Sequence, residues 1–173
     1  SGRGVGHDVV KSTIESLGGS ISIDSEEGNG TVFSIQLPLT LSIISVLLTE
    51  VGAEKYAIPL SSIIETAIVN YNEIQQVHGQ QVIKFRGKVV PLVFLDRVFE
   101  VSKMDREDEL FSLVIVKKGD KLAGLVVDSF IGQQEVVLKS LGQYLNQIFA
   151  ISGATILGDG QVALIVDCNT LIN

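Results

Sequence analysis

The sequence is poor in the residues that build disulfide bonds and metal sites. It has one cysteine, Cys168, and two histidines, His7 and His78. The two histidines lie far apart in the chain and do not have the spacing of a metal motif. A single cysteine provides no disulfide framework and fits a reducing compartment. We therefore expect no metal site, no disulfide bond and a cytoplasmic location.

Basic residues and long apolar runs are also scarce. The chain has 13 Lys and Arg against 20 Asp and Glu, a net charge of -7. An acidic chain without a basic cluster repels a phosphate backbone, which argues against nucleic acid as a partner. The longest nearly apolar stretch, residues 41–48, contains two serines and is much shorter than the roughly 20 residues of a spanning helix. We expect no direct membrane insertion.

Residues 1–39 have a different pattern from the rest of the chain. The sequence starts inside a glycine motif, SGRGVG, rather than with a methionine and a leader, so we interpret it as a piece of a longer protein. An apolar series with helical spacing follows, and Gly18 and Gly19 end the predicted helix. Two alternating segments, 20–24 and 31–37, then predict strands around an acidic turn.

From residue 40 onward, short runs rich in Val, Ile, Leu and Phe alternate with turns. They predict strands at 42–50, 55–59, 81–85, 89–95, 112–117, 122–127, 135–138, 154–157 and 162–166. So many short strands favour β-barrels. The segment from Ala57 resembles the segment from Gly124, and the segment from Val90 resembles the segment from Val162, which indicates a duplicated β unit. The charged segment 102–110 is the expected boundary between the two copies, which can be interleaved if a strand of one copy completes the barrel of the other.

The glycines before the predicted helix allow two interpretations. Backbone N–H groups there can approach a phosphate at a helix N-terminus, but a glycine-rich turn before a helix is also a common structural device. Residues 1–39 resemble the closing segment of the GHKL-type ATPase domain of the bacterial chemotaxis histidine kinases (CheA). The resemblance implies that Gly2, Gly4 and Gly6 are positions of the ATP lid. It also places Thr31 in the nucleotide pocket.

Several features of this family are missing or altered. The family needs an Asn-bearing helix for magnesium and an Asp-x-Gly-x-Gly motif for adenine, and neither occurs in this sequence. His7 stands where the family usually has methionine. We therefore expect vestigial nucleotide positions, no cofactor in this chain and no catalytic activity, whereas ATP and Mg belong to the full-length parent kinase.

No other catalytic constellation is evident. Asp96, Asp128 and Asp167 each follow an apolar strand, and an aspartate at the end of a strand is usually a turn former or a cap. The sequence has no Ser-His-Asp order and no G-x-S-x-G turn. We therefore assign no catalytic residues.

Residues 40–173 resemble the CheW-like fold, on segments such as EKYAIPLSSIIE, KFRGKVVPLVFLDRVF and SGATILGDGQVALIVD. The resemblance implies two SH3-like five-stranded β-barrels preceded by an incomplete α/β segment, so the fold class is mainly β. It also implies a regulatory docking domain, with the coupling protein CheW, the chemoreceptor cytoplasmic tip and the rest of the kinase as partners. The alternatives are ATP-dependent histidine kinase activity, in the full-length parent only, or a free-standing CheW-like adaptor.

Two groups of residues are candidates for contacts with partners. Arg86 and Gly87 form the tip of a predicted hairpin, which is either a solvated turn or a docking point, because Arg is favoured at interfaces. The second group follows the first predicted hairpin and is either core or partly exposed. It consists of Ile63, Ile64, Ile68 and Tyr71.

Overall fold

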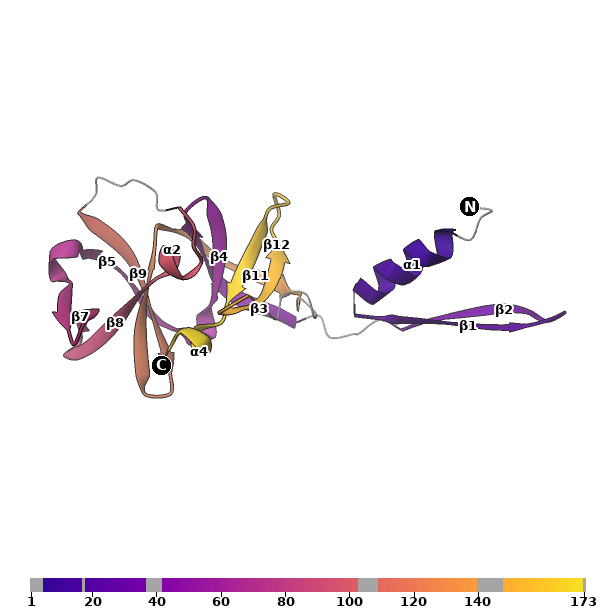
Figure 1. The fold of residues 1–173 in the computed structure, drawn as a ribbon, viewed down its shortest axis with the longest axis horizontal. Coiled ribbons are helices and arrows are strands. Elements are labelled where there is room, and N and C mark those ends of the chain that lie inside the picture. Colours follow the sequence, from indigo (N-terminus) through magenta and orange to yellow (C-terminus); the bar gives the residue numbers. More distant parts are fainter. Residues whose placement is uncertain (1–4, 17, 37–41, 103–108, 140–147, 173) are drawn as a thin grey trace. The chain divides into compact units, whose positions relative to one another are not determined.

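The computed structural model describes residues 5–16, 18–36, 42–102, 109–139 and 148–172 (Figure 1). The chain divides into two compact units, Ser1–Leu41 and Ser42–Asn173. We describe each unit by itself.

The first unit is a helix followed by a two-stranded hairpin. Helix α1 spans Val5–Ser16, β1 spans Ser20–Glu26 and β2 spans Gly30–Gln36. The helix ends in a Schellman motif, in which Gly19 N–H donates to Ile14 O and Gly18 N–H to Glu15 O, with Gly18 at a φ of 80°. The predicted stop at these glycines is confirmed.

The start of α1 differs from the sequence-based prediction. Gly6 and His7 were expected in the turn before the helix, but both lie in its first turn. A glycine there costs only about 0.5–1 kcal/mol relative to alanine, so helical backbone can extend over it. On the hairpin, Ile23 pairs with Phe33, and both side chains are about half exposed. This unit therefore buries little apolar surface of its own.

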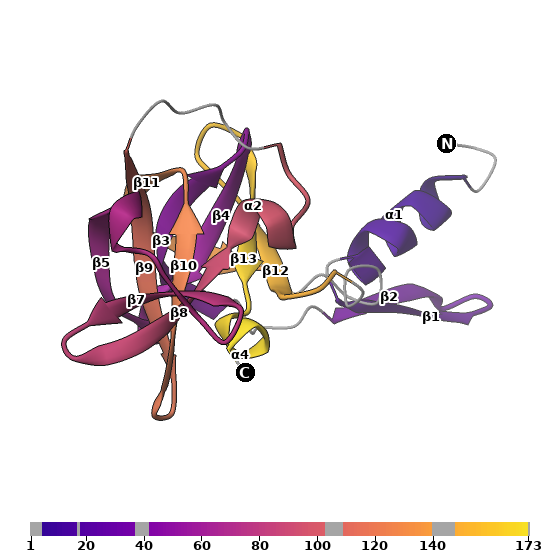
Figure 2. The same ribbon diagram turned by 60° about the vertical axis from the view of Figure 1, so that its left-hand side comes forward.

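The second unit consists of two sheets (Figure 2). Barrel 1 has the strand order β11-β3-β4-β13-β12, and barrel 2 has the order β5-β9-β10-β8-β7-β6. The strands of barrel 1 are β3 (Ser42–Val51), β4 (Glu54–Pro59), β11 (Ser129–Leu138), β12 (Ile151–Ile156) and β13 (Val162–Val166). Those of barrel 2 are β5 (Ile63–Asn70), β6 (Gln75–Val77), β7 (Gln80–Phe85), β8 (Lys88–Phe94), β9 (Leu110–Lys118) and β10 (Lys121–Val127). The mainly β prediction is confirmed.

Short helical turns join several of these strands. They are η1 (Leu60–Ser62), η2 (Tyr71–Glu73), α2 (Leu95–Val98) and α4 (Cys168–Leu171). A single-turn helix follows both β8 and β13, as α2 and α4 respectively, which is a second sign of the duplication. Among the described residues, no helix combines the length and apolar character needed to cross a membrane.

The two copies of the β unit exchange strands. The chain leaves barrel 1 after β4, passes through η1 and enters barrel 2 with β5; it returns after β10, through Asp128, to β11. As a result, β4 of the first copy pairs in parallel with β13 of the second, and β10 of the second with β8 of the first. Each barrel thus contains strands of both copies.

The expected boundary at 102–110 lies between the two copies in the sequence, but it is not a boundary between the two barrels. The segment falls between α2 and β9, and the strands before and after it, β8 and β9, belong to the same barrel. A charged segment identifies a solvated connection, but it does not show which sheet the next strand joins. That choice is made by pairing between distant strands, and the changes of sheet occur at η1 and Asp128 instead.

The sequence also missed two strands, β5 and β6. The register of β5 against β9 shifts between Ile63 and Glu65, which places Ile64 in a bulge. The duplicate bulge lies at Ile131, between Phe130 and Gly132 of β11. A bulge breaks the alternation that identifies a strand, and β6 has only three residues. Barrel 2 consequently has six strands rather than the expected five.

The strands in the middle of each sheet are buried on both faces. In β9, Leu113 and Ile115 pack inside barrel 2, whereas Val114 and Val116 belong to a core shared by strands of both barrels. Strand β3 behaves in the same way, with Leu48 inside barrel 1 and Leu47 in the shared core. This shared core joins the two barrels into one unit.

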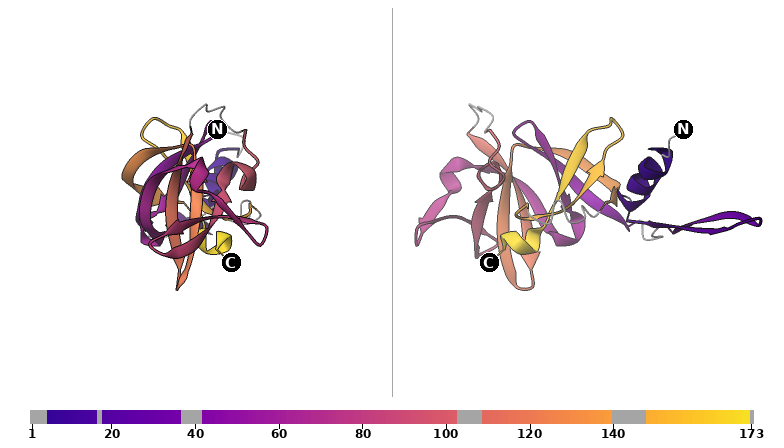
Figure 3. Two further views of the ribbon diagram at one scale, coloured as in Figure 1. Left: turned by 90° about the vertical axis from the view of Figure 1, so that its left-hand side faces the viewer. Right: turned by 45° about the vertical axis from the view of Figure 1, so that its right-hand side comes forward.

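Two equivalent glycines at hairpin turns have different surroundings. Gly52, between β3 and β4, and Gly119, between β9 and β10, both have a φ of 63°. A Cβ on Gly52 would lie 2.9 Å from the backbone O of Ser102, whereas a Cβ on Gly119 would meet nothing within 4 Å. In Figures 1 and 3 the β9–β10 hairpin projects beyond its neighbours.

This difference makes the two glycines a matched pair for a stability test. Gly119→Ala should cost about 1 kcal/mol, because the left-handed conformation is unfavourable for alanine. Gly52→Ala should cost about 1–3 kcal/mol more, because it adds a clash with a backbone oxygen. Urea unfolding of both variants measures the difference. Equal losses would contradict the tight packing at Gly52.

Candidate docking surfaces

The β7–β8 turn presents Arg86 and Gly87. Phe85 pairs with Lys88, and the two residues between them have φ values of 50° and 77°, which are typical of a type I′ turn. Glycine adopts this conformation without strain, so Gly87 has a geometric role. Arg86 adopts it at a cost.

The Arg86 side chain has a partner in its own barrel. Its Nη2 lies 3.0 Å from Glu65 Oε2 on β5, and its guanidinium lies 5.0 Å from the centre of the Phe85 ring. The ion pair lacks the geometry of a hydrogen bond, since Glu65 Oε2 has no hydrogen-bond partner. The Arg86 side chain is 70% exposed, so an exposed pair of this kind contributes about 0–1 kcal/mol to stability. The guanidinium remains accessible at the barrel surface.

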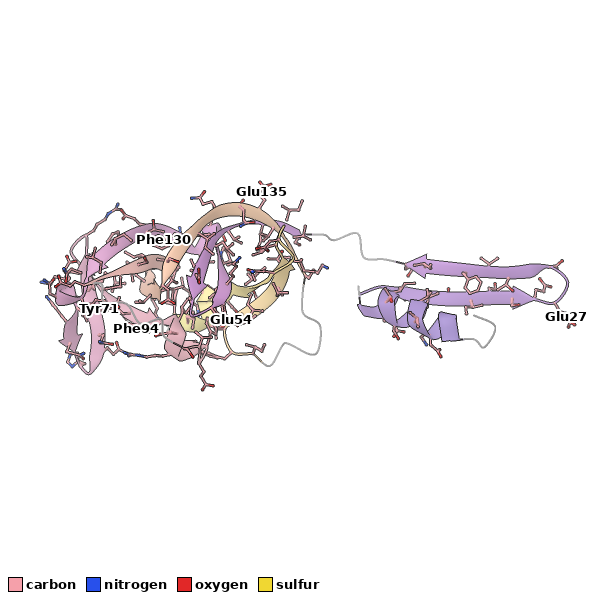
Figure 4. The ribbon with its side chains drawn as sticks, turned by 90° about the horizontal axis from the view of Figure 1, so that it is seen from above. Glu27, Glu54, Tyr71, Phe94, Phe130 and Glu135 are labelled. Carbon is pink, nitrogen blue, oxygen red and sulfur yellow. The ribbon has the colours of Figure 1, made fainter. Side chains whose placement is uncertain are left out.

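The predicted contact residues on and after β5 have different environments. Ile63 packs against the shared core, whereas Ile64 and Ile68 are exposed. The Tyr71 ring lies 4.9 Å from the Phe111 ring, and Tyr71 is partly exposed; Figure 4 labels it on barrel 2. Ile63 is thus partly buried, and the other three are more exposed.

We define the barrel-2 surface as the exposed apolar residues on the β5 side of barrel 2. Leu110, at the start of β9, is 48% exposed and lies opposite Asn70, next to Ile68 along the outer face. The sequence did not single out Leu110, because its place beside β5 depends on strand pairing. The surface consists of Ile64, Ile68, Tyr71 and Leu110.

Barrel 1 carries an apolar surface that the sequence did not reveal. Ile43 on β3 pairs with Val137 on β11, and Ile156 on β12 pairs with Val162 on β13. All four side chains are exposed, by 66%, 38%, 59% and 54% respectively. Paired residues project from the same face of a sheet. Each pair therefore forms an exposed apolar contact.

The two pairs lie side by side because barrel 1 closes between β11 and β12. The backbone groups of Lys139 and Ala154 exchange hydrogen bonds of 3.0 and 3.1 Å. If this antiparallel register is continued by two residues along each strand, it places Val137 opposite Ile156. The four residues thus form a row across four strands, which we call the barrel-1 surface. Figure 4 shows Glu135 of β11 at the exposed edge of the same barrel.

The strand-end aspartates act as turn formers and caps, as predicted. Asp167 Oδ1 accepts the Asn169 N–H at 3.2 Å and caps α4. Asp96 Oδ1 accepts the Arg97 N–H at 2.8 Å. Asp128 Oδ2 accepts the Gly52 N–H at 2.6 Å. Each of them thus accepts a backbone N–H of a turn or a helix start, and Asp167 Oδ2 also accepts the Thr170 hydroxyl at 2.9 Å.

The structure describes two of the four predicted nucleotide positions in the first unit. Gly2 and Gly4 lie outside the described residues, and Gly6 lies in α1. Thr31 is exposed on β2, with its hydroxyl 3.2 Å from Ser25 Oγ. The magnesium and adenine motifs of the family are missing from the sequence, and the assignment of vestigial nucleotide positions stays a prediction. Within the described ranges, no group of three or more His, Cys, Asp or Glu could hold a metal ion.

An apolar groove of about 470 Å³ lies on barrel 2 beside α2 and the C-terminal residues. Its one charged group is Arg97, whose guanidinium lies 4.4 Å from the Phe94 ring centre and donates to Gln81 Oε1 at 3.4 Å. The lining contains no carboxylate, thiol or imidazole. It therefore has no group for acid–base or nucleophilic chemistry.

The Cys168 thiol is a buried structural group. Its residue is 2% exposed in the shared core, and burial raises the pKa of the thiol to about 11, although a hydrogen bond with Ser62 opposes this shift. A thiol with a raised pKa is a poor nucleophile. Through its hydrogen bond with Ser62, Cys168 connects α4 to the η1 crossover. Its role is structural.

The comparisons with known proteins agree with this fold. The chain belongs to the CheW-like domain family, whose model matches residues 45–173. The scaffolding protein TtCheW from Thermoanaerobacter tengcongensis has a similar crystal structure, with a TM-score of 0.61 over 76% of this chain and 100% of that one. Their sequences are 17% identical, so this likeness concerns the fold.

Chemotaxis kinases match nearly the whole chain, including its first unit. It is 63% identical over 172 residues to the chemotaxis protein CheA of Bacillus subtilis. It is 47% identical to the sensor histidine kinase CheAY of Helicobacter pylori and 41% identical to CheA of Salmonella typhimurium. These matches include 99% or more of this chain but only 22–26% of the length of the three relatives. The predicted resemblance to chemotaxis histidine kinases is confirmed, and this chain corresponds to about a quarter of such a protein.

The buried thiol predicts a specific dependence of stability on pH. The Cys168 thiol ionises with a pKa near 9.0 when unfolded and about 11 when folded. The unfolded chain therefore loses this proton first, and the free energy of unfolding should fall as the pH rises from about 9 to about 11, by roughly 2 kcal/mol.

Comparing the chain with Cys168→Ala in urea unfolding at several pH values isolates this effect. All other titrating groups are shared, so the stability difference between the two proteins should change only in this window. A difference that stays constant from pH 8 to pH 11 would contradict a buried, protonated thiol.

Proposed function

We propose that this chain is a regulatory docking module of a chemotaxis histidine kinase, which binds the coupling protein CheW and the chemoreceptor tip. The observation that supports this most is the pair of exposed apolar surfaces on two barrels whose middle strands are buried on both faces. Contiguous exposed apolar residues are characteristic of interaction sites. Family membership and the absence of catalytic groups in the groove on barrel 2 also favour docking over catalysis.

The barrel architecture suits such a role. The interior of a small barrel is filled by its own side chains, so partners must bind to its outer faces and turns. The barrel-1 and barrel-2 surfaces lie on strands whose other faces are held by buried residues such as Val46 and Val69. Rigid strands lose little conformational entropy on binding. Both surfaces can therefore bind a protein partner with little loss of conformational entropy.

Signal transfer would pass to the rest of the kinase through the connection between the two units. That connection, residues 37–41, lies outside the described residues. We assign the ATP- and Mg-dependent phosphorelay to the whole parent kinase, located in the cytoplasm at receptor arrays, and not to this chain. Calorimetric titration with ATP tests this: measurable binding by this chain would overturn it.

The barrel-1 surface gives the first binding test. Ile156→Glu places a charge in the middle of the apolar row and should weaken binding to a CheW-type protein by at least about tenfold, because a charge cannot be buried there without a partner. Stability should change by less than about 0.5 kcal/mol, since Ile156 is exposed.

Val32→Glu is the matched control, because Val32 is an equally exposed strand residue of the first unit. Binding is measured by titration calorimetry with the purified coupling protein. If both variants bind as the parent chain does, the barrel-1 surface takes no part in docking.

Arg86 gives a second, independent test. Arg86→Gln removes the charge but keeps a polar side chain at the turn, and it should weaken association with the coupling protein or the receptor fragment while the melting temperature changes little. Glu65→Gln is the control, since it breaks the same ion pair and leaves the arginine in place. Equal weakening by both variants would show that the pair acts through the barrel rather than through contact.

A free-standing CheW-like adaptor is the alternative. The match of the first unit to kinases argues against it, because those relatives continue well beyond this chain. The mass of the native protein distinguishes the two.

A further inference from the structure

Asp128 lies where the chain passes from β10 of barrel 2 to β11 of barrel 1. Its Oδ2 accepts the Gly52 N–H at 2.6 Å, and its own N–H donates to Glu50 O at 2.9 Å. Both bonds are to the β3–β4 hairpin. In the side-chain bond, the two residues are 76 positions apart in the sequence. One residue therefore fastens the crossover to the hairpin turn.

A third segment closes over the same turn. The backbone O of Ser102 and the side chain of Val101 lie 2.9 and 3.2 Å from the position of a Cβ on Gly52. Val101 packs on the shared core, to which Val51 and Val127 belong. The hairpin of barrel 1, the crossover and the segment that follows α2 of barrel 2 thus meet at Gly52.

The duplication supplies a comparison within the same molecule. Gly119 has the same φ as Gly52, and Ser61 in η1 occupies the crossover position that corresponds to Asp128. In the part of the chain that the structure describes, no hydrogen bond joins Ser61 to Gly119, and Gly119 has open space around it. Only one of the two crossovers is fastened to a hairpin.

We propose that Asp128 is an interbarrel latch, which fixes the relative orientation of the two barrels by holding the β3–β4 turn against the β10–β11 crossover. A change in that orientation would slide the turn past the crossover and break the bond. Hydrogen bonds to charged groups are about twice as strong as neutral ones. The second crossover lacks this bond among the described residues, so the latch distinguishes the two crossovers of the repeated fold. The proposal does not depend on the identity of any partner.

The test measures the bond and the barrel orientation separately in the full 173-residue chain. Amide hydrogen exchange at Gly52 reports on the bond. Spin labels on Lys84→Cys of β7 and Gln133→Cys of β11, both exposed positions, report the distance between the barrels. The native Cys168 is buried and resists labelling. Asp128→Ala is compared with Ser61→Ala, the same change at the other crossover.

We expect Asp128→Ala to speed exchange at Gly52 by about tenfold or more and to broaden the distance distribution, while Ser61→Ala changes neither. Faster exchange with an unchanged distribution would overturn the latch, because the bond would then fasten the turn alone. If Asp128→Ala does not fold, Asp128→Ser takes its place, since it introduces the side chain of Ser61, which makes no bond to Gly119 at the other crossover in the described part of the chain. The same two readouts then decide, and no change in either overturns the proposal.

Discussion

The rest of the second unit depends on the apolar core shared by the two barrels. Strands β3, β9, β10 and β13 contribute residues to this core from one face and to a barrel interior from the other. A strand buried on both faces has no solvated side, so its sequence must be apolar throughout, as in Leu113, Val114, Ile115 and Val116. At about 25 cal/mol per Å² of buried apolar surface, such strands contribute most of the driving force for folding. The exchange of strands between the copies makes the two barrels inseparable.

This arrangement also determines where partners can bind. The faces that the barrels turn toward each other are buried in the shared core. Accessible apolar residues therefore lie on the outer strands and at strand ends. The row on barrel 1 exists because β11 and β12 close that barrel through Lys139 and Ala154. In barrel 2, the fold places the β7–β8 turn beside β5, where Arg86 and Glu65 form an ion pair. The same repeat therefore presents two chemically different outer surfaces.

Polar groups act at the points where the chain changes direction. Asp167 caps α4, Asp128 holds the β3–β4 turn, and Gly87 provides the conformation of the β7–β8 turn. The carboxylates of Asp96, Asp128 and Asp167 each accept a backbone hydrogen bond at a turn or a helix start. The duplication preserves backbone features more closely than side chains: the bulges at Ile64 and Ile131 and the φ of Gly52 and Gly119 recur, whereas Asp128 has Ser61 as its counterpart.

The sequence by itself determined the mainly β class, the Schellman end of α1, most strands and the structural role of the strand-end aspartates, because these depend on local periodicity and turn chemistry. It also carried the resemblance to chemotaxis kinases. It could not determine which barrel each strand joins, and it missed β5, whose bulge interrupts the alternation. Only the tertiary structure brought Ile43 beside Val137 and Ile156 beside Val162, and placed Gly52 under Asp128. These contacts join residues that pair through the sheet rather than along the chain, and local sequence patterns do not record such pairing.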